Sequence, residues 1–240
     1  MKLLAGGLRV KLFMDGADLD AMERAYRAGI VQGFTTNPTL MRKAHVTDYE
    51  AFARAAISSI PDLPISFEVF SDDFDVMAEE ARTIASWGGT TYVKIPITNT
   101  RGESSSPLIE KLSSEGLRIN VTAVTHPAQV RAAVRVLNPG VPSIVSVFAG
   151  RIADTGVDPV PVMANAVEIL RENPRAELLW ASPRELLNLF QAEQVGCHIL
   201  TATDNLLAKL HLIGKNLGEY SLETVQMFHD DARKAGYKII

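Results

Sequence analysis

The chain has 240 residues, of which 47% are hydrophobic and 22% charged, a composition typical of globular proteins. Its formal net charge is −4 with the two signs interspersed, so no basic face favours a nucleic acid or an acidic membrane as partner. No run of 18 apolar residues exists to suggest a membrane span, and the single cysteine, Cys197, cannot form an internal disulfide. These features favour a cytoplasmic enzyme.

Short β-rich segments alternate with amphipathic helical segments along the chain. Strands are expected at 11–15, 33–37, 64–70, 91–98, 118–124, 143–149, 176–182 and 198–203. Helical periodicity is clearest near 73–87, 126–138, 159–172 and 221–235. Because helical segments separate the strands, neighbouring strands should run parallel.

Eight such units fit an α/β fold of the (β/α)8 TIM-barrel type, and a doubly wound open sheet is the alternative. No linker or repeat divides the chain, so we expect one barrel domain over 1–240, with 215–240 as a C-terminal helical extension. The last helix carries four apolar side chains, which should pack on its own barrel or on a neighbour: Leu222, Val225, Met227 and Phe228.

One lysine lies on the strand face that should line the barrel. Side chains alternate between the two faces of a strand, so Val93, Ile95 and Ile97 face the helices and Lys94 points inward. Pro96 has no N–H for a central ladder, which puts Lys94 close to the C-terminal end of its strand. Because a buried, unpaired ammonium is costly, this position indicates chemistry rather than packing.

Further polar side chains should lie at or near the C-terminal strand ends, where barrel enzymes collect their catalytic groups. They are Asp15, Thr35, Asn37, Glu68, Asn120, Thr122, Ser146 and Ser182. Each one alone is more often a satisfied core group or a helix cap. Their convergence with a lysine favours a functional site.

A lysine beside two carboxylates suits imine chemistry. Desolvation favours the neutral amine, which is the form that attacks a carbonyl. The protonated imine then withdraws electrons from the neighbouring C–C bond, and Asp15 and Glu68 are available to move the protons. No His, Cys or carboxylate cluster has metal-ligand spacing, so we expect neither a metal nor another cofactor.

Six segments resemble the transaldolase family in order and spacing: FTTNPTL (34–40), SFEVF (66–70), VKIPIT (93–98), INVTAV (119–124), SVFAGRI (146–152) and ASPRE (181–185). The resemblance covers the whole barrel and is to the short bacterial-type transaldolases and the related fructose-6-phosphate aldolases. It implies sugar-phosphate substrates, the pentose phosphate pathway, and a homo-oligomer, either a pentamer or a decamer.

The resemblance also implies individual roles. Lys94 would form the Schiff base, Asp15 would shuttle the proton for C–C cleavage, and Glu68 with Thr122 would hold the catalytic water. Substrate-binding roles are implied for Thr35, Asn37, Asn120, Ser146, Phe148, Arg151, Ser182 and Arg184. The last three match the family's phosphate cradle, and two guanidiniums beside a hydroxyl suit a phosphate monoester.

Two positions favour transfer over simple cleavage. The transaldolases have Glu and Phe where this chain has Glu68 and Phe148, whereas the fructose-6-phosphate aldolases carry Gln and Tyr. The leading hypothesis is transfer of a dihydroxyacetone unit from sedoheptulose 7-phosphate or fructose 6-phosphate to glyceraldehyde 3-phosphate or erythrose 4-phosphate.

Three alternatives stay open: an aldolase that releases dihydroxyacetone, an enzyme of specialised sugar biosynthesis, and a catalytically silent barrel that binds sugar phosphates. Gly16 and Pro183 depart from the family pattern near the pocket rim.

Overall fold

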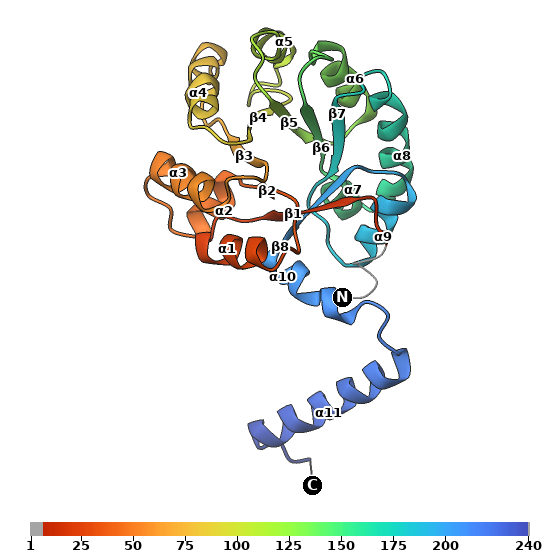
Figure 1. The fold of residues 1–240 in the computed structure, drawn as a ribbon. Coiled ribbons are helices and arrows are strands. Elements are labelled where there is room, and N and C mark those ends of the chain that lie inside the picture. The colour runs from red at the N-terminus through yellow and green to blue at the C-terminus, as the bar shows by residue number, and fades with distance from the viewer. Residues whose placement is uncertain (1–6, 240) are drawn as a thin grey trace.

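The computed structural model describes residues 7–239, so the first six residues and the last residue of the predicted domain lie outside its description. Eight parallel strands pair in chain order and close into a barrel, with helices around it (Figure 1). The predicted (β/α)8 architecture is therefore confirmed. No helix in the described part of the chain is long and apolar enough to cross a membrane.

The strands lie within the predicted segments or match them. They are β1 (Lys11–Asp15), β2 (Phe34–Thr35), β3 (Ile65–Glu68), β4 (Thr91–Pro96), β5 (Ile119–Val124), β6 (Ser143–Val147), β7 (Ala176–Trp180) and β8 (Ile199–Thr203). Pro96 is the last residue of β4, as its missing N–H predicts.

The described residues form more helices than the eight barrel helices and one C-terminal helix that were expected. The main outer helices are α1 (Leu19–Arg27), α3 (Tyr49–Ser59), α4 (Phe74–Ser86), α5 (Ser106–Ser114), α6 (Pro127–Val136), α8 (Pro159–Leu170) and α9 (Leu187–Gln194). Short helices α2 (Pro38–Lys43) and α7 (Ala149–Asp154) follow β2 and β6, while α10 (Asp204–Leu207) and a 3-10 turn (Ala208–Leu212) follow β8. Helix α11 (Leu217–Ala235) comes last.

Two apolar layers hold the barrel together. The larger one lies between strands and helices and includes Val93, Ile95 and Ile97, as the alternation predicts. The smaller one has six buried side chains, including Ala181. The other five come from five different strands and are here called the barrel floor: Phe13, Tyr92, Ile144, Leu179 and Ile199. Gly33 leaves space for it, since a Cβ there would lie 2.4 Å from the Phe13 ring. The floor fills the interior below the polar ends of the strands.

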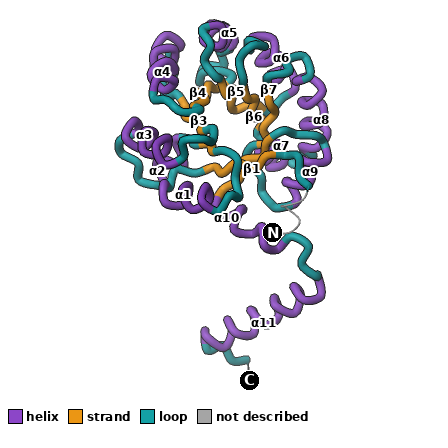
Figure 2. Tube along the Cα trace, in the orientation of Figure 1, coloured by secondary structure: helices purple, strands orange, loops and turns teal. Residues whose placement is uncertain are grey.

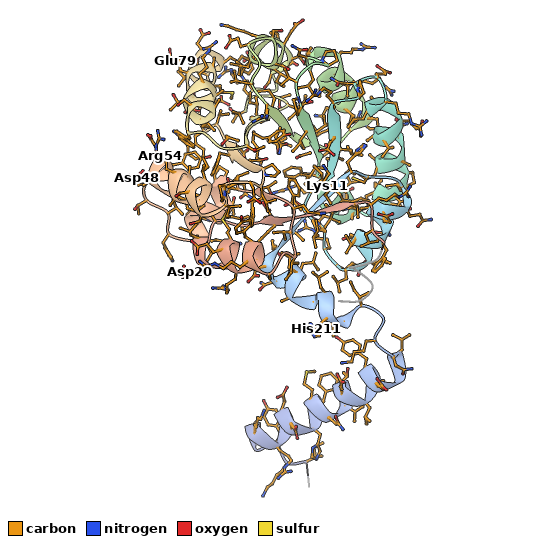
Figure 3. The ribbon with its side chains drawn as sticks, in the orientation of Figure 1. Lys11, Asp20, Asp48, Arg54, Glu79 and His211 are labelled. Carbon is orange, nitrogen blue, oxygen red and sulfur yellow. The ribbon has the colours of Figure 1, made fainter. Side chains whose placement is uncertain are left out.

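Charged side chains cover the outside of the helical layer, where Asp48, Arg54 and Glu79 point away from the barrel (Figure 3). Helix α11 differs from the other long helices, because it extends away from the barrel and has no buried residue (Figures 1 and 2). Its side chains Leu222, Val225 and Phe228 are 58%, 61% and 63% exposed. The sequence left two packing partners open for this helix, its own barrel or a neighbour. In the structure it does not pack on its own barrel.

Strand β5 departs from regular alternation. Ala123 has a φ of +59°, and the pairing of β5 with β6 shifts register between Val121 and Val124. Val124 consequently joins the outer apolar layer, while Thr122 and Ala123 both line the cavity at the barrel mouth. One extra residue in a strand commonly redirects side chains in this way next to functional sites.

Candidate active site

Lys94 lies in the middle of β4 and is 5% exposed. Its Nζ is 2.9 Å from Glu68 Oε2 and donates a hydrogen bond of 2.7 Å to the backbone carbonyl of Thr36. Glu68 and Lys94 are register partners on β3 and β4, so the sheet itself brings the two side chains together. The inward orientation predicted for Lys94 is therefore confirmed, and its ammonium is held in a buried ion pair.

Asp15 is the last residue of β1 and lines the same cavity as Lys94. Thr35 Oγ1 donates to Asp15 Oδ1 at 2.7 Å, and Asn37 Nδ2 lies 3.4 Å from Oδ2. Asn37 also caps α2, where its Oδ1 accepts from Leu40 N at 3.0 Å, which fixes the amide. Desolvation raises the pKa of Asp15, although Lys94 and the Thr35 hydroxyl act in the opposite direction. A raised pKa suits a carboxyl group that must both take and return a proton.

A chain of hydrogen bonds fixes the amide of Asn120 deep in the barrel. Asn120 Nδ2 donates to Ser66 Oγ at 3.0 Å, and Ser146 Oγ donates to Asn120 Oδ1 at 2.7 Å. Thr122, two residues further along β5, has a buried hydroxyl with no hydrogen-bond partner within residues 7–239. Since buried hydroxyls in proteins usually have a partner, this oxygen is suited to bind a ligand.

Two arginines line the same cavity from the β6 and β7 sides. The Arg151 guanidinium lies 5.8 Å from the centre of the Phe148 ring. Arg184 forms an ion pair with Asp154, with Nε 3.1 Å from Oδ1. Ser182 between them has a φ of +58°, and Pro183 does not remove Arg184 from the cavity.

The cavity at the barrel mouth has a volume of about 430 Å³. All the residues predicted for the site line it except Asn120, which lies behind Ser146 and contacts it. Within the described residues, no group of three or more His, Cys, Asp or Glu side chains could hold a metal ion.

Three further groups of the site were not predicted from the sequence. Thr201 lines the cavity and lies 2.6 Å from Thr35 Oγ1; alternation along β8 could have identified it. Asp154 pairs with Arg184, and only the fold brings them together. The Thr36 carbonyl holds Lys94 Nζ, and a backbone group leaves no trace in the residue pattern.

These observations define a (β/α)8-barrel enzyme whose polar site lies at the C-terminal ends of the strands, around a buried lysine paired with a carboxylate. The family model for transaldolase/fructose-6-phosphate aldolase matches residues 12–239. The chain belongs to this family.

Curated relatives agree with that assignment. The chain is 34% identical over 202 residues to "Probable transaldolase 2" of Listeria monocytogenes, covering 84% of this chain and 88% of that protein. It is 32% identical over 231 residues to "Probable transaldolase" of Thermoanaerobacter sp., covering 96% and 100%. A solved structure from Burkholderia cenocepacia J2315 shares the fold, with a TM-score of 0.62, 14% identity, and coverage of 98% and 88%.

Proposed function

We propose that this protein is a transaldolase that transfers a dihydroxyacetone unit through a Schiff base on Lys94. The observation that carries the proposal is the buried Lys94–Glu68 pair, with Nζ 2.9 Å from Oε2, in the same cavity as Asp15. Glu68 is close enough to take the ammonium proton, which leaves a neutral amine to attack the ketose carbonyl at C2. Glu68 then returns the proton to the departing hydroxyl, so that water leaves and the imine forms.

Cleavage follows from the imine. Asp15 takes the proton of the C4 hydroxyl, the C3–C4 bond breaks, and its electron pair moves toward the imine nitrogen to give an enamine. The aldose phosphate leaves, and the enamine carbon attacks the aldehyde carbon of the acceptor, whose oxygen receives the proton from Asp15. Water, placed by Glu68 and the unpartnered hydroxyl of Thr122, hydrolyses the new imine and frees Lys94.

The proposed donors are sedoheptulose 7-phosphate and fructose 6-phosphate, and the proposed acceptors are glyceraldehyde 3-phosphate and erythrose 4-phosphate. Support comes from Arg151, Ser182 and Arg184, which line the cavity from the side opposite β3 and could hold a phosphate. The volume of about 430 Å³ falls within the range of small-molecule sites. We further propose that the protein acts in the pentose phosphate pathway and in the cytoplasm.

Transfer is preferred to release of free dihydroxyacetone because Phe148 places a ring without a hydroxyl at the cavity wall. Without a phenolic proton donor there, the enamine persists until an acceptor arrives. An aldolase remains the second candidate, and the two are distinguished by measuring dihydroxyacetone with and without an acceptor aldehyde.

The proposal is tested by borohydride reduction in the presence of fructose 6-phosphate, followed by peptide mass spectrometry. We expect the reduced three-carbon or six-carbon adduct on Lys94, and no adduct in Lys94→Met. Lys11→Met is the matched control, because Lys11 also belongs to a barrel strand but pairs with Glu177. Tight binding of sugar phosphates with no adduct would instead support a catalytically silent barrel.

We also propose that the protein is a homo-oligomer, a pentamer or decamer as the family resemblance implies. Support comes from α11, whose apolar side chains are exposed and do not pack against their own barrel. Sedimentation of the full chain should show an assembly that Val225→Asp dissociates, while an exposed substitution elsewhere, Arg54→Asp, leaves it intact. A monomeric wild-type chain would refute this proposal.

A further inference from the structure

The ladder between β2 and β3 is short and stops before the end of β3. Only Phe34 and Thr35 of β2 have register partners on β3, Ile65 and Ser66. The last ladder bond runs from Thr36 N to the Ser66 carbonyl, at 3.1 Å. Beyond it, β2 gives way to helix α2, while β3 continues to Glu68.

On the β2 side, the backbone of Glu68 is left without ladder partners. In a regular parallel ladder its N–H would donate to the Thr36 carbonyl, and its carbonyl would accept from the N–H of residue 38. Residue 38 is a proline and has no N–H. The Thr36 carbonyl instead accepts a hydrogen bond of 2.7 Å from Lys94 Nζ. The backbone of the proposed proton-handling residue therefore needs partners from outside the sheet.

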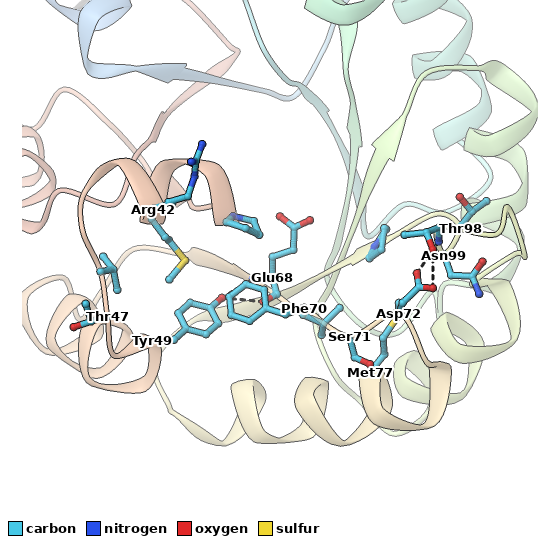
Figure 4. Close-up of a pocket in the computed structure, with 16 residues that line it drawn as sticks. Arg42, Thr47, Tyr49, Glu68, Phe70, Ser71, Asp72, Met77, Thr98 and Asn99 are labelled. Atoms are coloured by element: carbon cyan, nitrogen blue, oxygen red, sulfur yellow. Dashed lines mark hydrogen bonds between the residues drawn. The ribbon is translucent and has the colours of Figure 1, made fainter.

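One hydroxyl supplies both. Tyr49, the first residue of α3, accepts from Glu68 N–H at 2.8 Å and donates to the Glu68 carbonyl at 3.0 Å (Figure 4). Its ring packs edge-to-face on Phe67 and Trp87, with ring centres 6.2 and 5.2 Å apart. Burial raises the pKa of Tyr49, so the phenol keeps the proton that it donates.

Two cavities beside Glu68 explain why its hydrogen bonds to Tyr49 matter. Glu68 and Tyr49 both line a second cavity of about 730 Å³ at the C-terminal face, between α2 and the loops after β3 and β4 (Figure 4). Glu68 also lines the catalytic cavity, so it forms part of the wall of both spaces. With open volume on two sides, packing alone does not hold this end of β3.

We propose that Tyr49 is a positioning residue for the lysine–glutamate pair. Its hydroxyl replaces the two missing ladder partners of Glu68, and it thereby leaves the Thr36 carbonyl to orient Lys94. The inference rests on the proposed function, in which Glu68 moves the protons of imine formation and hydrolysis. Without the hydroxyl, the Glu68 N–H would compete with Lys94 for the same carbonyl, and both side chains would lose their alignment.

Tyr49→Phe is the test, because it removes one oxygen and keeps the aromatic packing. Two rates are measured with fructose 6-phosphate: single-turnover borohydride trapping at Lys94, and exchange of ¹⁸O from water into the ketose carbonyl. We expect both to fall roughly 10- to 100-fold, as for a small misplacement of a proton-transfer group. KM should change less than about twofold, because the phosphate-binding side is untouched.

Two controls separate positioning from general damage. Tyr26→Phe removes an exposed tyrosine hydroxyl that bonds Asp62 at 2.6 Å, and it should leave both rates unchanged. Trp87→Phe weakens the same aromatic cluster without touching the Glu68 backbone, so it should lower the unfolding temperature but not the rates per folded protein. Thermal unfolding of all three variants gives the folded fraction.

The outcomes are distinct for the two proposals. If the wild type forms no adduct at Lys94, the proposed function is refuted. If the wild type reacts and Tyr49→Phe reacts at the same rate, or if Trp87→Phe slows the reaction as much as Tyr49→Phe does, the positioning role is refuted while the proposed function stands.

Discussion

Replacing Lys94 with methionine tests the electrostatics of the site separately from its chemistry. The lysine side chain is 6% exposed and that of Glu68 is 18% exposed, so the substitution leaves a largely buried carboxylate without its cation. Removing one partner of a buried pair costs about 3–5 kcal/mol, and partial hydration of Glu68 favours the lower end. For a chain of this size, about 3 kcal/mol corresponds to a fall of roughly 6–12 °C in Tm.

The stability deficit should depend on pH. Lys94 lowers the pKa of Asp15, so its removal raises that pKa further above the value in the unfolded chain. When a carboxyl group binds its proton more tightly in the folded than in the unfolded state, the free energy of unfolding falls as pH rises. The deficit of Lys94→Met should therefore be larger at pH 8 than at pH 5, because a larger fraction of Asp15 is ionised at the higher pH without a cation beside it.

Circular dichroism melting at both pH values provides the measurement. Lys94→Met combined with Glu68→Gln should recover most of the lost Tm, because a neutral amide replaces the stranded carboxylate. Lys11→Met should cost less than about 1 kcal/mol, since Lys11 and Glu177 are 40% and 31% exposed. A Tm for Lys94→Met within about 2 °C of wild type at pH 8 would refute the reasoning.

Three further outcomes are expected. Asp15→Asn should block C–C cleavage while raising Tm, because it removes a desolvated carboxylate; an unchanged or lower Tm contradicts the role assigned to burial. Phe148→Tyr should increase dihydroxyacetone released without acceptor, measured enzymatically, and no increase means that the ring does not govern enamine lifetime. Gly150→Ala should raise KM for phosphorylated donors roughly tenfold or more, because the added Cβ would lie 1.6 Å from the Ser182 carbonyl and displace that residue. Steady-state kinetics provide the measurement, and an unchanged KM would show that the position of Ser182 does not matter for binding.

Strand alternation predicted the most informative part of the site. Lys94, Glu68 and Asn120 lie within regular stretches of β4, β3 and β5, where every second side chain faces inward, so local pattern and three-dimensional position agree. Regular alternation along β5 ends after Thr122. The left-handed residue Ala123 reverses the alternation, and nothing in its chemistry marks it for that conformation.

The ends of β2 and β6 show a second limit. Residues 33–37 read as a strand, but pairing stops at Thr35 because Pro38 starts α2. Residues 143–149 read as a strand as well, but α7 begins at Ala149. In both places short-range helix formation overrides β propensity. Groups that act through their backbone or through distant partners, such as the Thr36 carbonyl and Asp154, depend on tertiary structure and leave no periodic signal.

The barrel floor has a kinetic consequence. Because the floor fills the interior below the lysine, the leaving and the incoming aldose phosphate of the proposed reaction must pass through the same C-terminal mouth. In the proposed mechanism they also use the same arginines, so the product aldose has to depart before the next one binds. Double-reciprocal plots at several acceptor concentrations should then be parallel, and each aldose phosphate should compete with the other for the carbon-loaded enzyme.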